Sequence, residues 1–138
     1  MDLVIYVLSI LLIITSILVI YYWVDFFVRK GVQVTQEECY LKFQKAFPVA
    51  DMWMVMCALL SAIGLLTEQT YGLFFLVLAS SSLIFLALMD ITFNVENNLY
   101  RLVSTSREMK MELVCNVWFL SFGIILILYS WIRMALPI

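Results

Sequence analysis

The chain has 138 residues, of which 65% are hydrophobic and 13% are charged, and this charged fraction is about half of the ~25% found in soluble domains. Its formal net charge is −2 and no basic stripe is visible, so no nucleic-acid partner is predicted. Histidine is absent, which excludes histidine-based acid–base catalysis, histidine metal sites and histidine ligation of haem. The mean hydropathy of +1.06 predicts one integral membrane domain over residues 1–138.

The first predicted membrane span covers residues 3–24. It is longer than the apolar core of a cleavable signal peptide, and no basic segment precedes it, so we expect it to be retained. The aromatic residues 21–23 at its end are typical of an interfacial belt. Asp25 and Arg29 lie one turn apart and are predicted to form an ion pair. Gly31 follows and predicts the end of the helix, because glycine adopts positive φ without strain.

A polar connection, residues 32–47, separates the first span from the second. Thr35 and Glu38 have the spacing of a capping box, which predicts a short helix beginning there. Apolar and charged residues alternate along this helix, so we expect it to lie at the membrane interface. The second span is predicted over residues 48–67.

The third span is predicted over residues 72–90. Its first eighteen residues carry no charge, and at ~1.5 Å per residue they nearly cross a hydrocarbon core of ~30 Å. If the helix continues past Asp90, then Asn94, Asn97 and Arg101 share a face with that carboxylate.

The fourth span is predicted over residues 113–132. Thr105 and Glu108 have the spacing of a second capping box, so its helix is expected to begin near Ser106. Four apolar segments joined by short connections predict an all-α fold, a four-helix antiparallel transmembrane bundle with a short interfacial helix in the first cytoplasmic connection.

Basic residues predict the orientation of the bundle. The first and third connections carry seven lysines and arginines, whereas the opposite side carries only Arg133. The positive-inside rule therefore predicts both connections in the cytoplasm and both termini outside. In a prokaryotic cell this location is the plasma membrane.

An antiparallel bundle brings the polar residues at four helix ends to similar depth on the cytoplasmic side. We expect an acidic, amide-lined pocket there, and carboxylates and amides suit cations, protons and amine-bearing ligands. The alternative is structural: Asp51 caps a helix, and Asp90 pairs with Arg101 or Lys110. The candidate ligand-binding residues are Asp51, Asp90, Asn94, Asn97, Trp53, Glu112 and Asn116, with Asp25 nearby and Phe93 as a further possible wall. For Trp53 and Phe93 the alternative is a role as aromatic anchors at the membrane interface.

Two of these patches resemble a known pattern. The segments Phe47-Pro48-x-Ala50-Asp51-x-Trp53 and Asp90-x-x-Phe93-Asn94-x-x-Asn97 are similar to segments of small four-span prokaryotic membrane proteins of unassigned function. The resemblance covers the second and third spans. It implies no activity, only that the two patches belong together.

Three functions remain open. The leading hypothesis is a small membrane protein that binds a cation or a polar or amine ligand in the acidic pocket and transports it, with the lipid bilayer and a second copy or a larger membrane complex as partners. The second is a non-catalytic accessory or assembly subunit. The third is a lipid-headgroup enzyme that uses paired carboxylates to hold a divalent metal. An enzyme is the less favoured class, because no nucleophile–base pair is visible, and no cofactor is predicted.

Overall fold

The structure is a computed structural model that describes residues 2–136, and within that range it is helical with no strand. The chain follows an all-α course of long and short helices, confirming the predicted fold class. In chain order these are α1 (Leu3–Val24), the π-helical turn η1 (Asp25–Arg29), α2 (Glu38–Gln44), α3 (Phe47–Leu66), α4 (Tyr71–Glu96), the 3-10 helix η2 (Leu99–Ser104) and α5 (Arg107–Ala135).

Four helical segments are long and apolar enough to cross a membrane. They cover Leu3–Arg29, Glu38–Leu66, Tyr71–Glu96 and Arg107–Ala135. Many of their large apolar side chains are exposed, from Leu3 in α1 to Trp131 in α5. An exposed apolar surface of this extent suits contact with lipid rather than with water.

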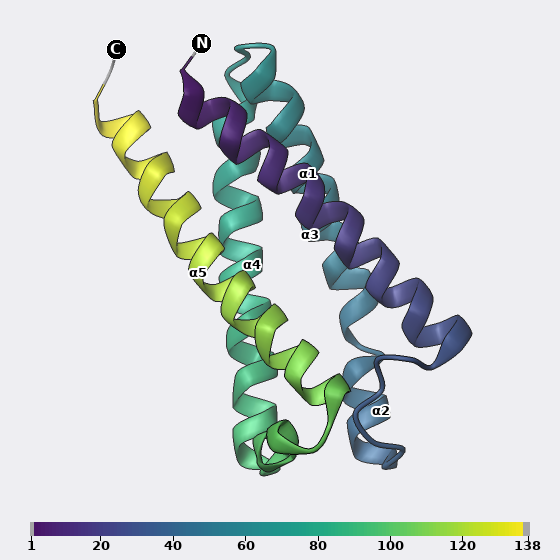
Figure 1. Ribbon diagram of the computed structural model, residues 1–138. Helices are drawn as coiled ribbons and strands as arrows, with labels where there is room; N and C mark the ends of the chain where they lie inside the picture. Colours follow the sequence, from purple (N-terminus) through teal and green to yellow (C-terminus); the bar gives the residue numbers. More distant parts are fainter. Residues whose placement is uncertain (1, 137–138) are drawn as a thin grey trace.

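The four long helices form an open arc rather than a closed bundle. α1 packs on α3, α3 on α4, and α4 on α5, and within residues 2–136 no comparable packing joins α1 to α5. Both termini lie at one end of the bundle, and α2 and η2 lie at the other (Figure 1). We call the end that holds α2 and η2 the polar end.

Small residues bring α3 and α4 into close contact. Gly64 of α3 lies against Gly72 of α4, where a Cβ added to Gly64 would come within 2.5 Å of the Gly72 Cα atom. Ser61 donates its hydroxyl to the Gly72 carbonyl at 3.0 Å. This is the close helix approach that small residues permit, and it joins the two helices at the centre of the arc.

Several helix ends differ from the sequence-based expectations. α1 has the predicted bounds of the first span, but the helix then continues as η1, and Lys30 rather than Gly31 takes positive φ. A Cβ at Gly31 would come within 2.5 Å of Asp25 Oδ2, so a larger residue there would require that carboxylate to move.

The two predicted capping boxes do not form. Thr35 accepts a hydrogen bond from the Glu37 amide in a turn that precedes α2. Ser106, one residue after the predicted Thr105, caps α5 by accepting from the Met109 amide at 3.2 Å.

The polar extension of the third span is shorter than expected. α4 continues past Asp90 to Glu96, and Asn98 then takes positive φ and ends it. Arg101 therefore lies in η2, where its guanidinium donates to the Asn98 carbonyl. The predicted one-face series thus ends at Asn94.

Candidate functional site

Three carboxylates are buried at the polar end of the bundle. Asp51 lies in the second turn of α3, Asp90 near the end of α4 and Glu112 near the start of α5. Their exposed fractions are 6%, 8% and 3%. The antiparallel course of the three helices explains why residues so far apart in the sequence meet at one depth.

None of the three buried carboxylates has a basic partner among residues 2–136. The ion pairs in that range join Arg29 to Asp25 and Lys42 to Glu38. The alternative in which Asp90 is neutralised by Arg101 or Lys110 therefore does not occur in this structure. Burying carboxylate charge without a cation is costly, so the cluster has to hold protons or a positively charged ligand.

Side-chain amides tie two of the carboxylates together. Gln44 of α2 donates its Nε2 to Asp90 Oδ1 at 2.9 Å and to Glu112 Oε1 at 3.4 Å. Asn94 of α4 donates its Nδ2 to the same Glu112 oxygen at 3.2 Å. One amide nitrogen thus lies within 3.4 Å of both carboxylates, which connects α2, α4 and α5 at the polar end.

The third carboxylate is held by α1. Trp23 is buried and donates its indole Nε1–H to Asp51 Oδ2 at 2.5 Å. Another polar contact at this end joins α5 to η2. Asn116 of α5 donates its amide N–H to the Tyr100 hydroxyl at 2.8 Å. Elements from the whole polar end therefore contribute polar contacts around the carboxylates, and we call these contacts together the polar network.

Three buried oxygens of this network have no hydrogen-bond partner. They are Asp51 Oδ1, Asn94 Oδ1 and Glu112 Oε2. An unpartnered buried polar atom costs about 1–3 kcal/mol, and more when it is charged. All three are acceptors when the carboxylates are ionised, so the group that would satisfy them is a donor or a cation.

The carboxylates line a large cavity between α1 and α5. Its volume is about 780 Å³, within the range of ligand pockets. Asp51, Asp90 and Glu112 contribute its acidic part, together with Gln44 and Asn116. Its other charged lining residues are Asp25, Glu108 and the basic Arg107. Apolar and aromatic residues of α1 and α5 make most of the remaining lining.

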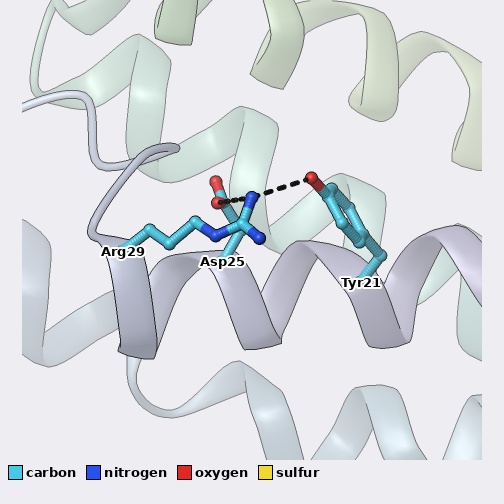
Figure 2. A network of polar contacts seen from close by, with 3 residues as sticks. All are labelled: Tyr21, Asp25 and Arg29. Atoms are coloured by element: carbon cyan, nitrogen blue, oxygen red, sulfur yellow. Dashed lines mark hydrogen bonds and ion pairs between the residues drawn. The ribbon is translucent and has the colours of Figure 1, made fainter.

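The π-helical turn η1 borders this cavity. Asp25 and Tyr21 line it, and Arg29 lies beside them with its Nη1 at 3.9 Å from Asp25 Oδ1. The same nitrogen donates to the Tyr21 hydroxyl at 3.4 Å, so the guanidinium lies between the two side chains (Figure 2). Arg29 is exposed and the predicted ion pair is long, so it contributes little to stability. π-turns are common at functional sites.

The structure brings most, but not all, of the predicted site residues together. Asp51, Asp90, Glu112 and Asn116 line the cavity, and Asn94 contacts it through Glu112. The remaining two do not join them. Trp53 is half exposed and absent from the lining, and Asn97 is exposed at the end of α4, where it donates to the Phe93 carbonyl.

Asn97 misses the site because the helix ends there, and Trp53 because it lies two residues from Asp51, on another face of α3. Phe93, the other possible wall, stacks instead on Phe43 of α2 at 4.0 Å between ring centroids. These positions correct the expectation that all the polar and aromatic residues near Asp51 and Asp90 face one pocket.

Two residues at the centre of the network were not among the predicted site residues. Gln44 was assigned to an interfacial helix, and Trp23 to an aromatic belt. Tyr40 and Gln44 lie one turn apart on α2 and are both buried. Their spacing of four residues was the signal in the sequence that both side chains share one face of the helix. For Trp23 the sequence held no signal that separates a belt residue from a carboxylate partner.

No group of three or more Cys, Asp or Glu side chains in residues 2–136 is arranged to hold a metal ion. Comparison with protein-family models, curated proteins and solved structures found no match to the chain. The resemblance of the two patches to four-span proteins therefore stays a prediction, and function has to be argued from the site alone.

Proposed function

We propose that this chain is a multi-pass membrane protein that binds a cation or amine-bearing ligand in its acidic cavity. The proposal rests on two observations taken together. Asp51 and Glu112 line the cavity, and each keeps one buried oxygen without a hydrogen-bond partner. A positively charged donor in the cavity would offset the charge of these carboxylates.

The lining of the cavity suits an ammonium group better than it suits a simple metal cation. Tyr22, Trp23 and Phe47 line the cavity with the carboxylates, and aromatic rings attract cations through their quadrupole. Carboxylates and aromatic rings together can hold the N–H groups and charge of an amine.

The binding test is thermal unfolding of the purified protein in lipid nanodiscs. The probes are alkali-metal chlorides, methylammonium and tetramethylammonium, applied to the wild type, to Asp51→Asn and to Asp90→Asn. A ligand at 100 times its Kd stabilises a protein by about 2.7 kcal/mol, so we expect a rise of several degrees in wild-type Tm with an ammonium ion. Both variants should lose most of this rise.

Glu96→Gln is the matched control, because Glu96 is an exposed carboxylate on the same helix as Asp90. It should respond as the wild type does. If no cation shifts Tm, the acidic cavity is not a cation site. The accessory-subunit hypothesis would then take precedence, and a stoichiometric partner should be sought by native purification. Turnover of a lipid headgroup that requires a divalent metal and is lost in Asp90→Asn would favour the enzyme hypothesis instead.

We further propose that the polar end faces the cytoplasm of a prokaryotic cell and that both termini lie outside. The basic residues of the first and third connections support this orientation. Cys39 gives a native probe, because it is exposed on α2, whereas Cys57 is buried. A membrane-impermeant maleimide should label Cys39 only after the cells are permeabilised, and Cys39→Ser identifies its signal.

A cysteine introduced by Gln69→Cys, in the exposed turn between α3 and α4, should react in intact cells. The opposite pattern at the two positions would invert the orientation. Transport requires in addition that the bound cation be released on the far side. An uptake assay in proteoliposomes with labelled methylammonium would test it.

A further inference from the structure

The cavity is much larger than a simple cation needs. Its volume of about 780 Å³ lies within the range of roughly 300–1,000 Å³ that is typical of ligand pockets. A metal ion or methylammonium would fill a small part of it. The ligand that fits this volume is a drug-sized molecule with a substantial body beyond its charged group.

The lining is divided along the helices. The carboxylates lie at the polar end, and α1 then contributes Leu11, Ile14 and Leu18 while α5 contributes Val114 and Phe119. The part of the chain that lines the cavity from Asp25 back to Leu11 is about 20 Å long, at ~1.5 Å per residue. An acidic region therefore continues into an apolar groove of considerable length.

The groove is open on the outside of the bundle. Ile14 and Leu18 of α1 are 46% and 59% exposed, and Val114 of α5 is 67% exposed, although all three line the cavity. A hydrogen bond from Trp118 Nε1 to Thr15 Oγ1 at 3.0 Å bridges the two walls. Because α1 and α5 do not pack along their lengths, the apolar surface inside the groove is continuous with the apolar outer surface.

We infer that the ligand is a lipophilic amine, with its ammonium group against Asp51, Asp90 and Glu112 and its apolar body between α1 and α5. The inference rests on the proposed cation site and adds the class of ligand. The amine enters from the bilayer through the gap between α1 and α5, since that route keeps its apolar body out of water. A phosphate-bearing lipid is not expected, because the lining holds five carboxylates against one basic residue, Arg107, and would repel the phosphate.

The test is a binding series in phosphatidylcholine nanodiscs with n-alkylamines from methyl to octyl, followed by tryptophan fluorescence, because Trp23 and Trp118 line the cavity. With affinity referred to the aqueous amine concentration, each methylene that leaves water should tighten binding by about fourfold. The n-alcohols of equal length correct for partition into the bilayer and should bind at least tenfold more weakly than the amines.

A matched pair of wall variants locates the apolar body. Leu18 and Ile17 are neighbours on α1 and are both 59% exposed, but only Leu18 lines the cavity. Leu18→Trp should weaken octylamine binding at least tenfold and leave methylammonium binding unchanged, whereas Ile17→Trp should change neither.

The possible failures are distinguishable. If methylammonium binds and needs Asp90, but affinity does not rise with chain length, the cation site stands and the lipophilic amine is wrong. Equal binding of alcohols and amines would overturn the inference, because the groove would then accept any amphiphile. Displacement of octylamine by phosphatidylethanolamine added to the nanodisc would also overturn it, in favour of a phospholipid headgroup. If an alkali-metal cation binds but no amine does, the cation site stands and the amine is wrong. If neither binds, both proposals fail.

Discussion

The indole N–H of Trp23, at the end of α1, donates to the buried carboxylate of Asp51 in α3 at 2.5 Å. This contact crosses between two long helices and satisfies one of the two Asp51 oxygens, while the other has no partner. Position 23 is thus a structural part of the acidic cavity as well as an aromatic residue near a helix end.

Trp23→Phe should destabilise the protein. Phenylalanine keeps an aromatic ring but removes the donor, so both Asp51 oxygens become unpartnered and about 1–3 kcal/mol is lost. Reversible unfolding in mixed micelles would measure the difference. Trp131→Phe is the control, because Trp131 is 67% exposed, and it should change stability by less than ~0.5 kcal/mol. Equal effects of the two variants would argue against the Trp23–Asp51 contact.

The double variant Asp90→Asn with Glu112→Gln should be more stable than the wild type when no ligand is present. Both substitutions keep the shape of the side chains and remove two acidic groups that lie within 3.4 Å of one Gln44 nitrogen. Sites that hold unfavourable charge for function commonly gain stability when they are neutralised.

A rise of about 1 kcal/mol or more, together with loss of amine binding, is the expected pair of results. A drop in stability with the binding retained would mean that the carboxylates serve structure.

Gly64→Ala should weaken the centre of the bundle. The added Cβ would come within 2.5 Å of the Gly72 backbone, and overpacking of this kind costs about 1–3 kcal/mol. Ala50→Val, at an exposed position of the same helix, adds side-chain volume without such a contact. Its Tm should stay close to that of the wild type, whereas the Gly64 variant should unfold several degrees lower.

Ser106→Ala and Thr105→Ala separate the observed helix cap from the one expected from the sequence. Ser106 accepts from the Met109 amide, so its loss should cost about 1 kcal/mol. Thr105 makes only a 3.5 Å contact with the Leu102 carbonyl and should be nearly neutral. Denaturant unfolding of both variants would measure the order, and the reverse order would support the predicted capping box.

The helical spans were predictable from the sequence because an apolar run of sufficient length leaves the chain few alternatives in a membrane. The helix ends were harder. Thr105 and Ser106 are adjacent hydroxyl residues, and only tertiary placement of the preceding 3-10 turn decides which one caps α5. At the end of η1 it is Lys30 that takes positive φ, and not the glycine that follows it.

The acidic part of the site followed from topology, since an antiparallel bundle places Asp51, Asp90 and Glu112 at the same end. The placement of Gln44 did not, because it requires α2 to bring that side chain between α4 and α5. The apolar groove could not be predicted either, because it depends on the separation of α1 from α5. The sequences of the four apolar spans do not show which pair of helices leaves a gap.

The most direct test of the central claim is equilibrium binding of radiolabelled octylamine to the nanodisc-embedded protein, corrected with empty nanodiscs. The account predicts one saturable site in the wild type and in Glu96→Gln, and at least a tenfold loss of affinity in Asp90→Asn and in Glu112→Gln. Saturable binding of equal affinity in all four proteins would place the amine elsewhere and contradict the account.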